Sequence, residues 1–179
     1  MSAHTAQSFT GVGADLNQRA AAAIDRGDYK EAERLYHEAL ALRRERLGPE
    51  HLDVAQSLSS LAWVCRRLQR FGEAEALYLE ALAIRRKLLG SDDPDVARSL
   101  TSLGACLTKE GRYLEAEKSL TEALMILRKA PDPPHSYECV TLDELAELYE
   151  VWGQSQRANE YRRQIDPSAS GHLPTNAEE

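Results

Sequence analysis

The residues Asp53 to Gly90 read DVAQSLSSLAWVCRRLQRFGEAEALYLEALAIRRKLLG, and this stretch decides the fold. Two runs in it carry apolar residues every three or four positions, with a short break near residues 69–71. Such spacing lays one apolar stripe along each α-helix. The stretch therefore predicts two antiparallel helices, with stripes formed by Leu58, Leu61, Ala62 and Cys65 in the first and by Ala74, Leu77, Tyr78, Ala81 and Leu82 in the second.

The same pattern recurs when the sequence is shifted by 42 residues. Small residues recur where two helices would cross closely, and large ones recur where neighbouring pairs would interdigitate. A periodic code of this kind is typical of a solenoid built from stacked helix pairs. The repeating positions are Leu16, Leu58, Leu100 and Leu142; Ala20, Ala62, Gly104 and Ala146; Ala32, Ala74, Ala116 and Ala158; and Ala39, Ala81, Ala123 and Ile165.

The chain resembles the tetratricopeptide repeat family, through Leu-x-x-Leu-Ala/Gly in each first helix and alanine at two fixed places in each second helix. Its 42-residue unit and the linkers LGPEHLDVA (47–55) and LGSDDPDVA (89–97) are similar to the kinesin light chain branch. The resemblance covers residues 14–165 and implies an all-α, right-handed α-solenoid of four antiparallel helix pairs. Kinesin light chains commonly carry Leu-Asn-Asn-Leu-Ala in the first helix, and of those asparagines only Asn17 is present here.

Outside that domain, residues 1–13 and 166–179 are polar and show no periodicity, which predicts a disordered arm and a disordered tail. Within it, Asp28 is placed to cap a helix, and Asp93-Pro94 supplies a cap followed by proline at the first helical position. Gln69 stands where the other pairs have glycine, so we expect a tighter or slightly strained turn there.

Composition excludes several classes of function. The net charge of −7 and the low aromatic content argue against a nucleic-acid binder. No apolar run approaches the roughly 20 residues of a membrane span, and residues 1–13 lack the order of a signal peptide, so we expect a cytoplasmic protein that does not bind membranes. The three cysteines have no C-x-x-C spacing and are expected to be small buried thiols.

No constellation resembling an active site is present. The five histidines are scattered, without the i, i+4 spacing of metal ligands, and no phosphate loop or nucleophile motif occurs. We therefore expect a non-enzymatic protein without a cofactor or metal. Basic residues do cluster at the ends of the second helices, where they fit either an anionic partner or solvated helix ends, and we favour the latter. They are Arg43, Arg44 and Arg46; Arg85, Arg86 and Lys87; and Arg128 and Lys129.

In the family that the chain resembles, the first helices line a concave groove. The face opposite the core stripe of each first helix then supplies the candidate binding residues. An apolar side chain flanked by acids would suit the middle, near Trp63, and a basic flank would suit the acidic C-terminal end. Trp63 is equally compatible with packing between helix pairs. The predicted groove residues are Asn17, Ser59, Trp63, Arg66, Arg67, Thr101, Thr108, Lys109, Asp143 and Glu147.

Two functions remain open from the sequence. The first is an adaptor or scaffold that binds an extended or helical segment of another protein in this groove. The alternative is a structural protein that self-associates into a homo-oligomer without using the groove.

Overall fold

The structure, a computed structural model, describes residues 3–131 and 135–165. All regular secondary structure in these ranges is α-helical, as the sequence predicts. The eight helices are α1 (Ala3–Asp25), α2 (Tyr29–Leu47), α3 (Leu52–Arg67), α4 (Phe71–Leu89), α5 (Pro94–Lys109), α6 (Tyr113–Lys129), α7 (His135–Val151) and α8 (Ser155–Ile165).

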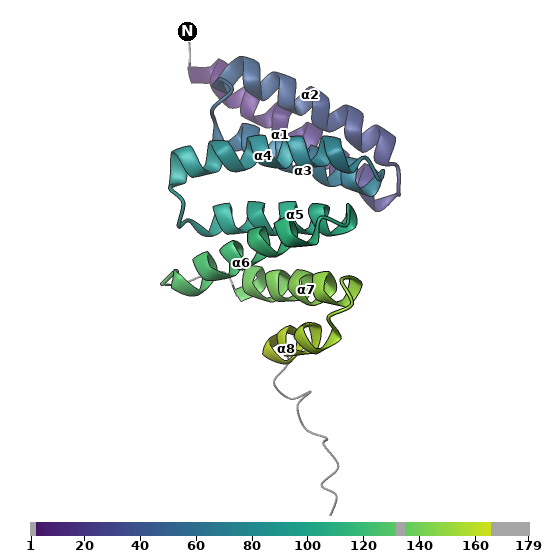
Figure 1. Cartoon of the computed structure of the whole chain (residues 1–179). Helices are drawn as coiled ribbons and strands as arrows, with labels where there is room; N and C mark the ends of the chain where they lie inside the picture. Colours follow the sequence, from purple (N-terminus) through teal and green to yellow (C-terminus); the bar gives the residue numbers. More distant parts are fainter. Residues whose placement is uncertain (1–2, 132–134, 166–179) are drawn as a thin grey trace, which may run out of the picture.

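The helices form four pairs that stack one on another, from α1–α2 at one end to α7–α8 at the other (Figure 1). Successive pairs are joined because α2 packs on α3, α4 on α5, and α6 on α7. The first helices of the last two pairs, α5 and α7, also pack on each other. Helices distant in the stack make no such contacts within the described residues, which is the architecture of a solenoid.

The start of α1 differs from the prediction. The helix begins at Ala3, so it includes most of the segment expected to be a disordered arm. Gly13 is buried in this helix, and a methyl group added to it would lie 3.6 Å from Nε of Arg43 in α2. Packing against α2 therefore offsets the low helix propensity of glycine. The predicted tail, 166–179, lies outside the described residues.

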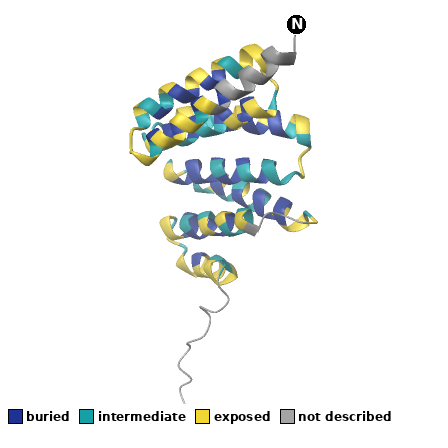
Figure 2. Ribbon diagram, turned by 180° about the vertical axis from the view of Figure 1, so that it is seen from behind, coloured by how far each residue is buried: buried dark blue, intermediate teal, exposed yellow. Residues whose placement is uncertain are grey.

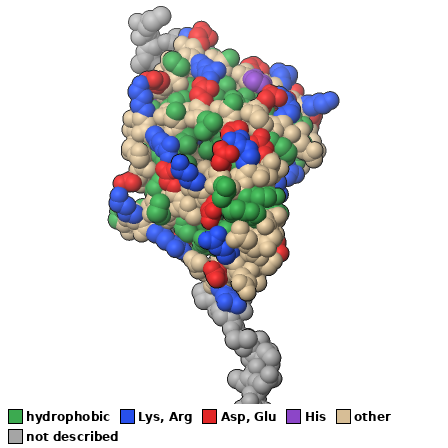
Figure 3. All heavy atoms as spheres, in the orientation of Figure 1, with side chains coloured by type: hydrophobic (Ala, Val, Ile, Leu, Met, Phe, Trp, Pro, Cys, Tyr) green, Lys and Arg blue, Asp and Glu red, His purple; other side chains and the backbone are tan. Residues whose placement is uncertain are grey.

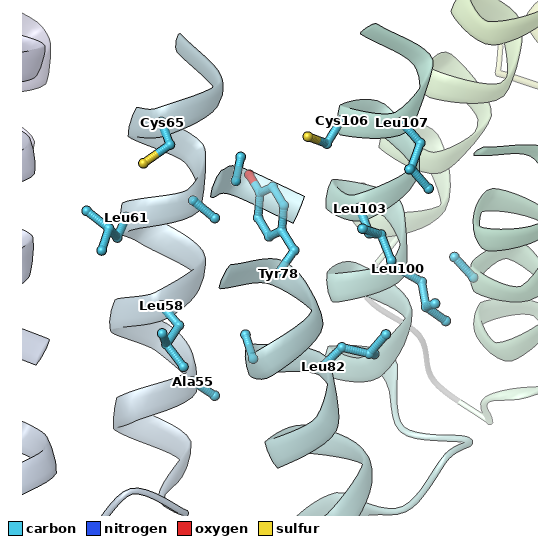
Figure 4. Close-up of a cluster of buried hydrophobic side chains, with 14 of the residues drawn as sticks. Ala55, Leu58, Leu61, Cys65, Tyr78, Leu82, Leu100, Leu103, Cys106 and Leu107 are labelled. Carbon is cyan, nitrogen blue, oxygen red and sulfur yellow. The ribbon is translucent and has the colours of Figure 1, made fainter. Parts of the chain in front are cut away.

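The core confirms the repeat of small and large positions. Buried residues run along the facing sides of the helices, and exposed residues lie outward (Figure 2). In the second pair, Tyr78 points from α4 into the space between α3 and α5, with Cys65 on one side and Cys106 on the other (Figure 4). The alanines that repeat in the second helices, Ala32, Ala74, Ala116 and Ala158, are fully buried.

Two of the three cysteines are buried, as predicted. Cys65 and Cys106 are buried, whereas Cys139 in α7 is only partly buried. Burial raises the pKa of Cys106 to about 11, so this thiol stays protonated and unreactive at neutral pH.

The turns follow the local signals in the sequence. Asp28 accepts the backbone N–H of Glu31 at 3.1 Å, and Asp93 accepts that of Asp95 at 2.8 Å ahead of Pro94. Gln69 adopts φ 61°, the left-handed conformation that glycine adopts at the matching turns of the other pairs. The turn has the same backbone hydrogen bonds as the glycine turn at Gly27, so it is not tighter, and a left-handed non-glycine residue is where backbone strain is expected.

Ion pairs link neighbouring repeats with the same 42-residue period. Arg70 pairs with Glu33, and Arg112 pairs with Glu75, in both cases at 2.6 Å. The basic ends of the second helices are matched in the same way, so acidic and basic side chains lie beside one another on the face seen in Figure 3. These partially exposed pairs each contribute little to stability, but they neutralise the basic clusters locally. The further pairs are Arg44–Glu80, Arg86–Glu122, Lys87–Glu50, Lys129–Asp92 and Arg128–Glu138.

Candidate functional site

A hollow of about 350 Å³ opens over the first helices α3 and α5, in the middle of the stack. Its apolar wall comes from the first and second pairs, and its polar wall comes mainly from α3 and α5. It is therefore built by three successive repeats. The lining residues are Ile24, Tyr36, Gln56, Ser59, Ser60, Trp63, Arg85, Arg98, Ser99 and Ser102.

Trp63 forms part of the apolar wall of the hollow, and its ring also contacts Tyr29 and Arg67. The ring lies 6.2 Å from that of Tyr29 at the start of α2, centroid to centroid. The guanidinium of Arg67 lies over both rings, 5.5 Å from the Tyr29 centroid and 5.7 Å from the Trp63 centroid, and donates a hydrogen bond to the Tyr29 hydroxyl at 3.1 Å. Trp63 is thus half-buried. It both packs between helix pairs and lines the hollow.

Arg85 forms the floor of the polar wall. Its side chain comes from α4, only 3% of its surface is exposed, and Nη1 donates to the hydroxyls of Ser59 and Ser99, each at 2.8 Å. Its Nη2 donates to Oε1 of Gln56 at 3.3 Å. The same Gln56 oxygen accepts from Nη2 of Arg98 at 3.2 Å, so two guanidinium groups converge on one neutral amide.

The positions 42 residues before and after Arg85 show that the buried arginine belongs to the repeat pattern. In the first pair, Arg43 donates to Ser57 at 2.5 Å, and Asn17, with its amide oxygen turned toward the guanidinium, accepts at 2.8 and 3.0 Å. In the third pair, Leu127 replaces the arginine, and the hydroxyls of Thr101 and Thr141 bond directly to each other at 2.8 Å. An arginine that ties two first helices together is therefore a repeated structural device, and only its second copy lies in the hollow.

Two residues predicted to face the groove are instead buried. Thr101 and Thr108 are about 5% exposed, and each donates its hydroxyl to a carbonyl of its own helix, from Ala97 and Gly104 respectively. The reason is that α5 packs against four helices, α3, α4, α6 and α7, so little of its surface remains free. Neither threonine is available to a partner in this structure, and placing them on the groove was wrong.

The remaining predicted residues lie on α3, α5 and α7. Arg66 is half-buried, and its Nε has no hydrogen-bond partner among the described residues. Lys109 pairs with Glu147, while Asp143 is exposed. Between them, burial raises the pKa of the Glu144 carboxyl above its ordinary value, although the nearby charge of Arg66 opposes the rise. The predicted acidic cluster is therefore partly neutralised by its own basic neighbours.

The sequence interpretation missed Arg85, Arg98 and Gln56. Arg85 was grouped with the solvated residues at the helix end, and that assignment was wrong, because the side chain is buried. A signal was present: Arg85 follows Ala81 by four residues, on the stripe that faces the core. Arg43 has the same relation to Ala39.

The hollow offers aromatic and aliphatic surface next to guanidinium and hydroxyl donors. Aromatic and arginine side chains are enriched in protein interfaces. Within the described part of the chain, no cluster of three or more histidine, cysteine or acidic residues is arranged to hold a metal ion. None of the described helices is long and apolar enough to cross a lipid bilayer.

Comparison with known proteins gives consistent relatives. The profile of the tetratricopeptide repeat matches residues 14–87, 64–129 and 95–165. BtubC (BKLC) from P. vanneervenii has a similar structure, with a TM-score of 0.77 and 23% sequence identity over 93% of this chain and 68% of that chain. Comparison with curated protein sequences gives no match.

A kinesin light chain-type protein from Podosopora anserina, described as having nearly identical TPR-like repeats, is also similar. One of its crystal structures gives a TM-score of 0.75 at 25% identity, covering 91% of this chain and 77% of that chain. A second crystal structure, of a variant with one substitution, gives a TM-score of 0.72 at 27% identity, covering 87% of this chain and 73% of that chain.

Proposed function

Since the chain belongs to the tetratricopeptide repeat family, whose repeats mediate protein–protein interactions, we propose that it is a non-catalytic adaptor. In this proposal, a segment of another protein binds across the face formed by the first helices. The hollow beside Trp63 and Arg85 is the observation that carries the proposal. Apolar and cationic side chains line this hollow together, and its volume of about 350 Å³ is large enough for a side chain.

The shape of the hollow fits one apolar anchor residue of the partner. Trp63, Tyr36 and Ile24 offer apolar surface. The rear support of Trp63 by Tyr29 and Arg67 limits its rotation, so binding costs less side-chain entropy. Buried aromatic contacts of this kind dominate the free energy of most protein interfaces.

The charges fit an acidic neighbour of that anchor. Arg85 and Arg98 lie in the polar wall, whereas Arg44 and Arg86, at the ends of the second helices, are already paired with Glu80 and Glu122. An acidic partner segment would therefore be attracted to the hollow rather than to the helix ends.

Selection of random 12-residue peptides displayed on phage tests this function. We expect enrichment of sequences with a large apolar residue next to Asp or Glu, and loss of their binding to the Trp63→Ala protein. Peptides that bind Trp63→Ala as tightly as the wild type would contradict binding on this face. Melting temperatures measured in parallel separate lost contacts from lost folding.

Self-association is a second candidate, favoured by exposed apolar side chains on α6. Leu114 is 72% exposed and Met125 is 67% exposed. If these residues mediate assembly, light scattering will show a mass that rises with concentration in the wild type and not in Leu114→Lys or Met125→Lys. A constant monomeric mass would exclude this role.

A further inference from the structure

Arg85, like its counterpart Arg43, has no acidic side-chain partner in the described part of the chain, but Arg85 is buried whereas Arg43 is only half-buried. Arg70 and Arg112 bind carboxylates of neighbouring repeats. Arg85 is more deeply buried than either, yet its hydrogen-bond acceptors are two serines and one glutamine. Within the described residues, no carboxylate lies at ion-pair distance from it. A buried cation without a counter-charge is costly, and a bound anion would relieve that cost.

Arg98 adds a second donor at the same point. It shares the Gln56 oxygen with Arg85. Its own charge is balanced by Asp95 at 3.3 Å, and its guanidinium also lies over the Tyr137 ring. The two arginines and Asp95 together leave one unbalanced positive charge in the hollow.

We propose that the hollow binds a single carboxylate, that of an Asp or Glu side chain in the partner segment, against the converging guanidinium groups of Arg85 and Arg98. This rests on the proposed function and names the chemistry that its partner must carry. Rotation of the Gln56 amide frees the point where both arginines now donate, and a carboxylate oxygen takes that place. Hydroxyls of Ser60 and Ser102, which also line the hollow, supply further donors.

The charge balance selects a carboxylate over a phosphate. One unbalanced positive charge matches one carboxylate, whereas a phosphate group carries a charge of about −1.5 to −2 at pH 7 and would leave a buried excess of negative charge. Burial, together with the charge of Arg98, lowers the pKa of the Arg85 guanidinium to about 10, although the charge of Asp95 opposes the shift. A side-chain carboxylate is favoured over a chain terminus because the proposed partner segment lies across the first helices, with chain on both sides of the hollow.

Titration of the full chain followed by NMR of the arginine Nε–Hε groups tests this site. The probe is the α-amide of N-acetylglutamate, and the neutral control is the α-amide of N-acetylglutamine, at constant ionic strength. We expect saturable shifts of the Arg85 and Arg98 signals with the glutamate probe and none with the glutamine control. N-acetylalanine, which carries only a terminal carboxylate, and inorganic phosphate should bind more weakly than the glutamate probe.

The variant Arg85→Leu removes the site with little risk to the fold. Leu127 occupies the matching position of the next repeat, where Thr101 and Thr141 bond to each other as Ser59 and Ser99 could in the variant. We expect its affinity for the probe to fall about tenfold or more. Arg43→Leu is the matched control, because it removes the same side chain from the first pair, outside the hollow, and should leave probe binding unchanged.

The outcomes separate this inference from the proposed function. Unsaturable shifts, equal binding to Arg85→Leu, or tighter binding of phosphate or N-acetylalanine would overturn the carboxylate site. Selected peptides that bind Arg85→Leu as well as the wild type would also overturn it, while leaving the adaptor function standing. A probe that binds as expected with no selectable peptide would contradict the adaptor function alone.

Discussion

At position 69, a glutamine holds the backbone conformation that glycine holds in the other turns. Its φ of 61° is close to the 76° of Gly111, which occupies the matching position of the next pair. A side chain in this conformation costs roughly 1–2 kcal/mol, because its Cβ crowds the following carbonyl.

The two positions allow reciprocal substitutions. Gln69→Gly should raise the free energy of unfolding by about 0.5–1 kcal/mol, after allowing for the greater freedom of glycine in the unfolded chain. Gly111→Gln should lower it by a similar amount. Urea denaturation of both variants measures the difference, and equal effects of the same sign would show that backbone strain is not the cause.

Glu144 is a second residue whose environment has a measurable consequence. Burial raises the pKa of its carboxyl above the ordinary value of 4.5, against the opposing charges of Arg66 and Lys109. The folded chain then binds this proton more tightly than the unfolded chain does. The contribution of Glu144 to stability therefore falls as pH rises from 4.5 to the raised pKa, and stays low above it.

Glu144→Gln should consequently be more stable than the wild type at pH 8, with the advantage disappearing as pH falls below 4.5, the ordinary pKa of glutamate. Chemical denaturation at both pH values measures this. Asp143→Asn removes the same charge from the neighbouring exposed position and should show a smaller advantage at pH 8. A Glu144→Gln advantage that is independent of pH would contradict the titration argument.

At the scale of the helix, Gly104 shows how closely the elements of a pair approach. A Cβ added to this residue of α5 would lie 2.5 Å from Cγ of Leu120 in α6. The matching positions of the other pairs hold alanine, and the sequence predicts a small residue here on that ground alone. The sequence does not reveal that the helices of the third pair approach so closely that only glycine fits at this position.

Gly104→Ala should therefore lower the free energy of unfolding by about 1–3 kcal/mol, because Leu120 must shift to admit the methyl group. This is the opposite of the usual gain when alanine replaces glycine in a helix, roughly 1 kcal/mol. Gly72→Ala in α4 is the control, since a Cβ there meets nothing within 4 Å and should be neutral or stabilising. If both variants behaved alike, close helix crossing would not explain the glycine.

The same scale explains which predictions from sequence succeeded. The repeat of Ala74 and Ala116 is visible because a close helix crossing admits only small residues, whatever surrounds it. The exposure of Thr101 and Thr108 was misjudged because a helix of the stack packs against neighbouring pairs as well as its own partner. The prediction assumed that residues opposite the apolar stripe of a helix are exposed, which holds only where the helix has a single buried side. Arg85 lies on the core-facing stripe of its helix, but it was predicted to be exposed because its side chain is charged.

At the scale of the whole molecule, the stack brings Arg85 and Arg98 together with the apolar surface of Trp63 in one hollow. Several other exposed charges are paired between repeats, as in Arg44–Glu80 and Lys109–Glu147. The hollow beside Trp63 is built by three repeats, so the site exists only when these repeats are stacked in register. Binding at the proposed site therefore requires the folded, stacked solenoid.

The central claim is that a partner segment binds on this face with Trp63 as its main contact. Isothermal titration calorimetry of a selected peptide against the wild type and Trp63→Ala tests it most directly, with the melting temperature of each protein measured beside its affinity. The account predicts that Trp63→Ala loses at least about 2 kcal/mol of binding free energy, the usual size of a hot-spot contribution. An unchanged affinity in a folded Trp63→Ala protein would contradict it.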